Sequence, residues 1–258
     1  MVCGKYLTMT KFLKFSKPDN LLNFDNNAKT VKGQKSGYKT GILYLAPYKT
    51  SGFNVCPMAS KGCIKACLNT AGQGIYPIVQ TSRINKTRWY MQERDTFLAR
   101  LRKEISLFVK RCEKENFIPC LRLNGTSDIP FEVTGIMEEF PNVQFYDYTK
   151  IYKRIIKYTL GLMPKNYYLV YSVNEDNEAQ AFKVLKSGVN IAMVFLNQLP
   201  KTYKGYKVID ADKNDLRFTD PKNVICGLVA KGRARKDESG FVKNWKEIFS
   251  KLEPVTRS

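Results

Sequence analysis

The stretch YYLVYSVNEDNEAQAFKVLKSGVNIAMVF, residues 167–195, contains two short apolar segments on either side of one helix-compatible segment. Tyr167–Ser172 and Val189–Phe195 are rich in aromatic and β-branched residues, which predicts buried β-strands. The intervening Asp176–Ser187 is rich in residues that favour helices and is followed by Gly188. The stretch therefore predicts a strand–helix–strand unit, the connection that joins parallel strands.

The same alternation continues in both directions along the chain. Further strands are predicted over residues 41–46, 119–124, 143–147, 206–210 and 224–228, and helices over 77–115 (one long or broken helix), 131–140, 150–162 and 241–252. Residues 1–40 are polar and basic with scattered apolar positions, so we expect an irregular N-terminal arm or an edge hairpin. Alternating strands and helices indicate a parallel sheet, and we predict that residues 41–258 form one α/β domain, a partial (β/α)6-type barrel.

Polar clusters follow four of the predicted strands, and they favour the barrel over an open doubly wound sheet. In a parallel barrel the carboxyl ends of the strands converge on one mouth, where sites are built. Any single cluster is equally well explained by residues that cap the next helix. Four in succession favour a shared site, and the clusters are Asn124–Asp128, Asp147–Lys150, Ser172–Glu175 and Asp210–Asp212.

Composition limits the chemistry and suggests a partner. Lys and Arg outnumber Asp and Glu by 43 to 23, and the resulting charge of +20 predicts nucleic acid as a partner, with a lysine-rich solubilising surface as the alternative. The chain has no histidine, which excludes Ser-His-Asp and Cys-His catalysis and Cys/His zinc sites. No apolar stretch is long enough to cross a membrane, and no export signal is visible. We therefore expect a cytoplasmic protein, in the host cell if it is viral.

Three of the seven cysteines lie in one short loop, with the spacing CxxxxxxCxxxC: Cys56, Cys63 and Cys67. An odd number of cysteines in a reducing compartment favours metal binding over disulfides. Thiolate ligands select iron–sulfur clusters, zinc or copper(I), and three of them leave one coordination position open. The alternative is a closed zinc site whose fourth ligand is Cys3, Cys112, Cys120 or Cys226.

The cysteine loop lies within LYLAPYKTSGFNVCPMASKGCIKACLNTAGQG, residues 43–74, which resembles the signature of the phage gene product 88 family. The resemblance continues along most of the chain, in RLNGTSD (122–128), FYDYTK (145–150), VIDADKNDLRF (208–218) and GLVAKGRA (227–234). Proteins of this family are usually recorded without a known function. The resemblance therefore implies a phage-type protein and no particular activity.

At a coarser level, three cysteines after a first strand and then βα units are similar to the radical S-adenosylmethionine (SAM) enzymes. That resemblance implies a partial barrel and a 4Fe-4S cluster on Cys56, Cys63 and Cys67, with one iron free to bind a small molecule such as SAM. The sequence departs from that family in its cysteine spacing, which is not CxxxCxxC, and in lacking a clear GGE-type segment after the second strand.

Candidate site residues follow from these patterns. Polar contacts to a cofactor are predicted for Asn124, Thr126, Ser127, Tyr171, Ser172 and Asn174. Without histidine, carboxylates and phenols must transfer protons, so the predicted catalytic residues are Asp128, Asp147 and Tyr148. Predicted nucleic-acid contacts are Lys231, Arg233, Arg235 and Lys236 in a basic loop, with Arg83 and Arg88 on the long helix; the alternative is a solvated helical face. Two hypotheses remain: an iron–sulfur enzyme acting on nucleic acid, and a non-catalytic nucleic-acid-binding protein with a structural metal site.

Overall fold

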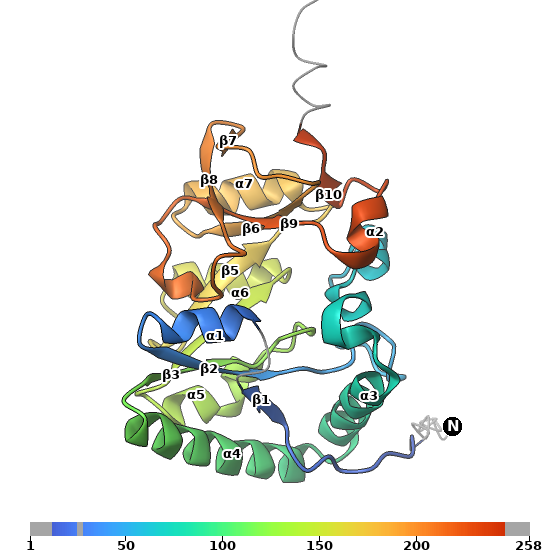
Figure 1. Cartoon of the computed structure of the whole chain (residues 1–258), viewed down its shortest axis with the longest axis vertical. Helices are drawn as coiled ribbons and strands as arrows, with labels where there is room; N and C mark the ends of the chain where they lie inside the picture. The colour runs from blue at the N-terminus through green and yellow to red at the C-terminus, as the bar shows by residue number, and fades with distance from the viewer. Residues whose placement is uncertain (1–11, 25–27, 246–258) are drawn as a thin grey trace, which may run out of the picture.

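A largely parallel sheet of ten strands forms the centre of the computed structural model, which describes residues 12–24 and 28–245 (Figure 1). β1 and β7 pair antiparallel with β2 and β8, and the other pairings are parallel. The strand path is β1 (Leu22–Phe24), β2 (Tyr38–Leu43), β3 (Ile118–Arg122), β4 (Gln144–Thr149), β5 (Tyr167–Ser172), β6 (Ile191–Phe195), β9 (Ile225–Val229), β8 (Tyr206–Asp210) and β7 (Thr202–Tyr203), with β10 (Val242–Lys243) beside β6.

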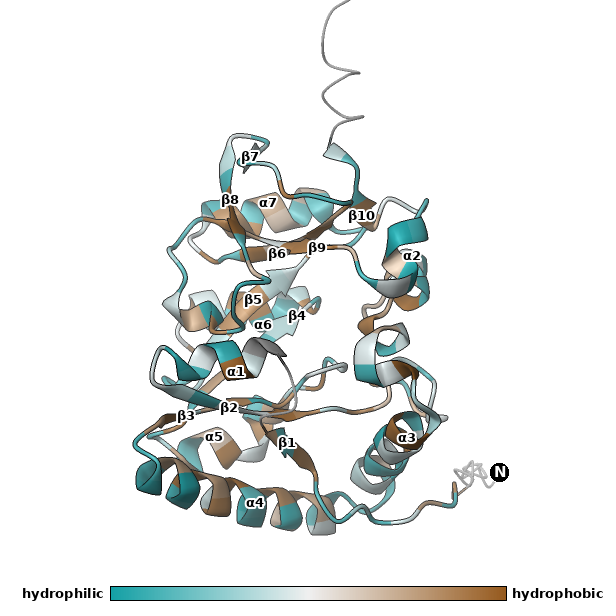
Figure 2. Cartoon of the chain, viewed as in Figure 1, coloured by the Kyte–Doolittle hydropathy of each residue, from teal (hydrophilic) through white to brown (hydrophobic). Residues whose placement is uncertain are grey.

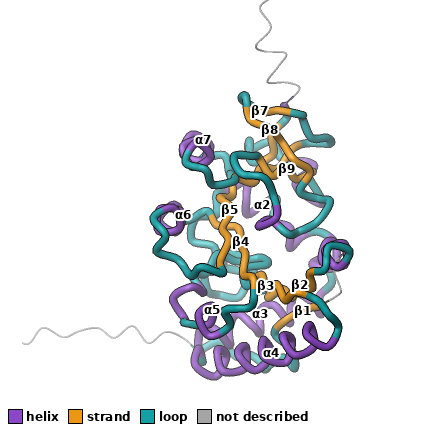
Figure 3. The backbone as a smooth tube through the Cα atoms, turned by 90° about the vertical axis from the view of Figure 1, so that its left-hand side faces the viewer, coloured by secondary structure: helices purple, strands orange, loops and turns teal. Residues whose placement is uncertain are grey.

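The helices that connect the strands gather on one side of the sheet, as Figure 3 shows for α5, α6 and α7. Strands β2 to β6 follow one another in chain order, and right-handed crossovers between strands in such an order place the helices on the same face. These helices are α4 (Arg94–Lys114), α5 (Ile136–Glu139), α6 (Tyr152–Thr159) and α7 (Glu178–Lys186). The main hydrophobic core lies between them and the sheet, and includes the fully buried Leu121, Phe145, Leu169 and Ile191.

The long helix predicted over residues 77–115 is broken into α3 (Pro77–Gln92) and α4 at Glu93. Helix α4 is amphipathic, and Figure 2 shows its alternating apolar and polar bands. Its buried residues Phe97, Leu101, Ile105 and Phe108 recur every three or four positions, which is the spacing of one helix face. No helix in the described part of the chain combines the length and apolar character needed to span a membrane.

The opposite face of the sheet carries smaller apolar clusters. Cys120 and Tyr146 pack around Leu216, and Leu216 also lies against α1 (Ala28–Gln34) next to Gly33. Cys226 belongs to a neighbouring cluster on this face. Cys120 and Cys226 are fully buried, so both are small core residues, as their positions inside predicted strands suggest.

The predicted parallel α/β sheet is confirmed, whereas strand pairing in the described residues gives an open path that ends at β1 and β7 and does not show a barrel. Strands predicted over 167–172 and 206–210 coincide with β5 and β8, but β8 lies beyond β9 instead of following β6. Within residues 1–40, expected to form an irregular arm or an edge hairpin, lie β1, α1 and the start of β2, and β1 is an antiparallel edge strand. The helix predicted over 241–252 falls mostly outside the described residues, and its described part contains β10.

Candidate functional site

A cavity of about 300 Å³ lies where the carboxyl-terminal parts of the parallel strands converge. Arg122 of β3, Tyr148 of β4 and Ser172 of β5 line it on the sheet side. The opposing wall is the segment from Pro47 to Thr70, which contains the cysteine loop. Parallel strands bring their carboxyl ends to one edge, so residues far apart in the sequence share this site, as ligand sites of α/β proteins do.

Cys56, Cys63 and Cys67 all line this cavity, and all three are half-buried and free of disulfides. Cys63 lies in the short helix α2 (Lys61–Lys65), and Cys67 directly precedes the 3-10 turn η1 (Leu68–Thr70). The Tyr48 backbone N–H donates to the Cys56 Sγ at 3.3 Å. Burial raises the pKa of Cys56 to about 12 and also raises that of Cys67. Metal binding would therefore have to displace protons from these thiols.

The three thiols share a cavity without forming a ready ligand cluster. Within residues 12–24 and 28–245, no group of three or more His, Cys, Asp or Glu side chains is arranged to hold a metal ion. The type of donor fits an iron–sulfur cluster or zinc, because three soft ligands lie on one wall. Cys112, Cys120 and Cys226 are buried and do not line the cavity, and Cys3 lies outside the described residues.

The end of β5 holds the cysteine loop in place. Glu175 accepts hydrogen bonds from the Gly62 N–H at 2.6 Å and from the Ser60 hydroxyl at 2.7 Å. Ser60 is the N-cap of α2, and its oxygen accepts from the Cys63 N–H. Asn174 donates to the Met58 carbonyl at 3.4 Å. The loop that carries the three cysteines is therefore fastened to the strand end from which Ser172 lines the cavity.

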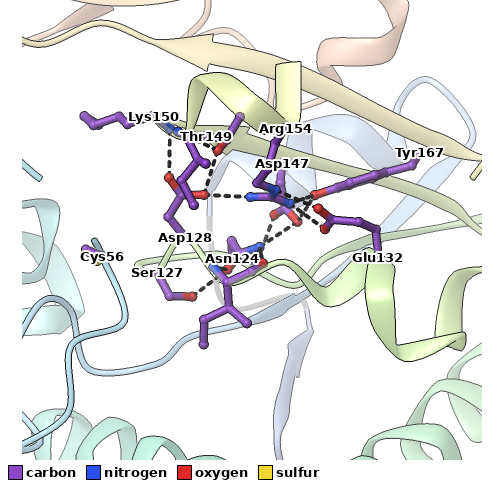
Figure 4. Close-up of polar contacts among 12 residues, drawn as sticks. Cys56, Asn124, Ser127, Asp128, Glu132, Asp147, Thr149, Lys150, Arg154 and Tyr167 are labelled. Atoms are coloured by element: carbon purple, nitrogen blue, oxygen red, sulfur yellow. Dashed lines mark hydrogen bonds and ion pairs between the residues drawn. The ribbon is translucent and has the colours of Figure 1, made fainter. Parts of the chain in front are cut away.

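The loop of residues 124–128 is held from behind by a buried polar network (Figure 4). Asp147 accepts from the Asn124 N–H at 2.8 Å, from the Asn124 amide at 3.1 Å and from the Tyr167 hydroxyl at 3.0 Å. Asn124 in turn accepts from the Ser127 hydroxyl at 2.9 Å. Burial raises the pKa of Asp147 to about 6, although Arg154 and Arg122 act to lower it. Asp147 therefore positions the loop from behind the cavity wall.

Asp128 lines the cavity, and an arginine of α6 compensates the charge of its carboxylate. Arg154 of α6, itself only 4% exposed, donates to the Asp128 carboxylate at 2.6 Å and to Glu132 at 2.8 Å. The same carboxylate accepts from the Thr149 hydroxyl and the Lys150 N–H, both at 2.8 Å. Three partners, at the end of β4 and on α6, fix the orientation of this carboxylate, so Asp128 presents a rigid edge to the cavity.

Nine of the twelve residues predicted to bind metal or cofactor or to act in catalysis line the cavity. Asp147, Tyr171 and Asn174 do not, because each faces the scaffold. Tyr171 is buried and donates to Gln180 of α7 at 2.6 Å. Those in the lining are Cys56, Cys63, Cys67, Asn124, Thr126, Ser127, Asp128, Tyr148 and Ser172.

Three charged cavity residues lie outside the set predicted to bind a metal or cofactor or to act in catalysis: Arg122, Lys150 and Asp215. The Arg122 guanidinium lies 4.6 Å from the Tyr148 ring centroid and pairs with Asp215 at 3.1 Å. Both Arg122 and Lys150 lie near the ends of predicted strands, and that position could have indicated that they line the cavity. Asp215 enters through a loop after β8, which no strand-end pattern indicates.

The predicted nucleic-acid residues fall into two groups. Arg233, Arg235 and Lys236 lie on the exposed 3-10 turn η5 (Gly232–Lys236), which follows Lys231 and packs beside η1 of the cysteine segment. Lys231 pairs with Asp212 at 2.6 Å. On α3, in contrast, Arg83 is buried and donates to Asn69, and Arg88 donates to the carbonyls of Ser51 and Lys14. Arg83 and Arg88 therefore hold segments together, and the buried Arg83 presents little surface to a phosphate.

Fold and site together define an α/β protein with a cysteine-lined cavity at the carboxyl edge of a largely parallel sheet. No curated protein and no solved structure matches the chain. The family described as Gene product 88 does match, over residues 20–244, and the chain belongs to that family.

Proposed function

We propose that this phage-type protein binds a 4Fe-4S cluster through Cys56, Cys63 and Cys67, with the fourth iron available to a small molecule in the cavity. The observation that supports the proposal is that all three cysteines line the same cavity as the polar residues of three strand ends. The proposal includes the partial barrel, which is supported by the strands in chain order and by helices on one face.

The proposal assigns separate roles to the residues that line the cavity. A bound cluster would supply a redox-active and Lewis-acidic iron. The Tyr48 N–H stabilises the Cys56 thiolate, because a hydrogen bond to a sulfur favours its charged form. The hydroxyls of Thr126 and Ser127 orient the ligand, and Asp128 and Tyr148 are the groups able to exchange a proton with it. S-adenosylmethionine is one candidate ligand.

Anaerobic purification followed by iron and sulfide analysis tests the cluster. We expect a brown protein with about four irons per chain, the count of such a cluster, and an EPR signal after reduction that changes if SAM is the ligand. Cys56→Ser, Cys63→Ser and Cys67→Ser should each lose iron. Cys120→Ala, a core variant outside the cavity, should retain it. A colourless protein that contains zinc would contradict the proposal and support a structural zinc site.

Nucleic acid is the second part of the proposal, as substrate of the site or as partner of a non-catalytic protein. It is supported by the exposed basic turn η5 beside η1, next to the cavity wall. Arg233→Ala combined with Lys236→Ala should weaken DNA or RNA binding and flatten its salt dependence, because fewer phosphates are then neutralised. Lys153→Ala on α6, also exposed, is the matched control. Affinity that does not depend on ionic strength would contradict this part.

A further inference from the structure

Lys150 is a cation on the cavity wall whose ammonium is bonded only to a neutral side chain. Its Nζ donates to the Ser172 hydroxyl at 2.8 Å and lies 5.9 Å from the Phe241 ring centroid. Among the described residues, no carboxylate pairs with this ammonium. Figure 4 shows the side chain extending away from the network around Asp128 and Arg154. The half-buried Lys150 therefore has no charged partner within that part of the fold.

The two carboxylates that line the cavity have arginine partners of their own. Asp128 pairs with Arg154 at 2.6 Å, and Asp215 pairs with Arg122 at 3.1 Å. Of the cations in the lining, Arg122 is thus compensated and Lys150 is not. A positive charge that is partly desolvated and unpaired favours an anion from outside.

We propose that Lys150 and Ser172 form an oxyanion subsite that binds a carboxylate or phosphate group of the small molecule in the cavity. The inference deepens the proposed function, since it assigns a chemical class to the ligand beside the cysteines. The Lys150 ammonium carries the positive charge and has two N–H donors besides the one that it donates to Ser172. The Ser172 hydroxyl can rotate to donate its own proton to the same anion. Thr126 and Ser127 donate their hydroxyl protons to the Leu45 carbonyl and to Asn124, so their oxygens would accept from other polar groups of such a ligand.

The test measures stabilisation of the anaerobically purified protein by two probes, inorganic phosphate and acetate. The unfolding midpoint is followed against probe concentration at constant ionic strength, because a ligand that binds the folded state raises it. Lys150→Met should weaken probe binding about tenfold, the loss typical of a hydrogen bond to a charged group, and Ser172→Ala about fivefold. Lys153→Met removes an exposed lysine from α6 and should bind as the wild type does.

Stabilisation by phosphate alone assigns a phosphate ligand, and stabilisation by acetate alone assigns a carboxylate ligand; either supports the subsite if Lys150→Met loses it. The subsite is overturned if neither probe stabilises the wild type, or if Lys150→Met responds as Lys153→Met does. Ser172→Ala provides the same comparison should Lys150→Met fail to fold. The iron content of every variant is measured as well. A protein that lacks iron but binds the probe would contradict the proposed cluster and still support the oxyanion subsite.

Discussion

The Glu175 carboxylate accepts a hydrogen bond from the Gly62 N–H at 2.6 Å, although 113 residues separate the two. Glu175 follows β5, and Gly62 lies between the cysteines in the buried part of α2. A side chain at Gly62 would meet this carboxylate, since a Cβ there would lie 2.7 Å from Glu175 Oε1. The strand end therefore sets the position of the cysteine loop against the sheet.

Glu175→Ala should loosen the cysteine loop. The change removes the acceptor of two hydrogen bonds at α2, which we expect to cost about 2 kcal/mol of local stability. Trypsin should then cleave after Lys61 or Lys65 faster than in the wild type, because local opening exposes the backbone. Asp176→Ala, a neighbouring exposed carboxylate, should leave the cleavage rate unchanged. Equal rates in the two variants would show that Glu175 does not hold the loop.

Asp147 should make the folded state less stable as the pH rises. Burial raises the pKa of its carboxyl to about 6, above the value of 3.8 for an exposed aspartate. The folded chain therefore binds more protons than the unfolded chain between these values. Its stabilising contribution is present in full below pH 3.8 and is lost as the pH rises through 6. The loss amounts to about 3 kcal/mol, because one unit of pKa shift corresponds to ~1.4 kcal/mol.

Asp147→Asn isolates this effect because it removes the titration and keeps one acceptor for Asn124. The free energy of unfolding, measured with urea from pH 3.5 to pH 7, should fall relative to the variant as the pH rises. Other carboxylates titrate in both proteins, so the difference between the two curves is the quantity to compare. A constant difference over this range would mean that Asp147 does not carry a raised pKa.

The sequence predicted the central sheet better than its edges. Buried strands such as β5 are marked by apolar side chains on both faces, whereas β1, β7 and β10 have only two or three residues and no such pattern. The position of β8 beyond β9 depends on pairing with distant residues, which no local pattern encodes.

Within the site, Asn124 and Ser172, two of the polar residues that follow predicted strands, line the cavity. The pattern could not separate lining residues from those behind the wall. Asp147 and Tyr148 are adjacent, yet successive residues of a strand point to opposite faces. Tyr148 faces the cavity, whereas Asp147 faces Arg154 of α6 on the opposite side of the sheet. Which of the two residues lines the cavity depends on the face that the helices cover, and the local sequence does not encode that face.

Lys86 should make the folded state more stable as the pH rises, which is the opposite of the effect expected for Asp147. Its Nζ donates to the Leu21 carbonyl at 2.8 Å, and burial lowers its pKa to about 8 from 10.5, although Glu104 acts to raise it. Between these values the unfolded chain binds more protons, so the stability contributed by this group rises with pH. Relative to Lys86→Met, the free energy of unfolding should increase by about 3 kcal/mol from pH 8 to pH 10.5. Parallel urea curves for the two proteins over this range would contradict the prediction.

Gly125 allows the loop of residues 124–128 to lie directly on β2. Its N–H donates to the Leu43 carbonyl at 2.9 Å, and a Cβ at this position would lie 2.6 Å from the Tyr44 ring and 2.8 Å from Ile42. Gly125→Ala should therefore push the loop away from β2 and cost about 1–3 kcal/mol, the usual penalty for overpacking.

Gly33→Ala is the matched control, because a Cβ in helix α1 would meet only Leu216 at 3.5 Å, an ordinary contact. This change should stabilise the protein by about 0.4–1 kcal/mol, since alanine loses less backbone entropy on folding than glycine does. Urea unfolding of both variants checks the signs. If Gly125→Ala is as stable as Gly33→Ala, the close contact of Gly125 with β2 does not determine the loop position, and the hydrogen bonds of Asn124 and Asp128 hold the cavity wall instead.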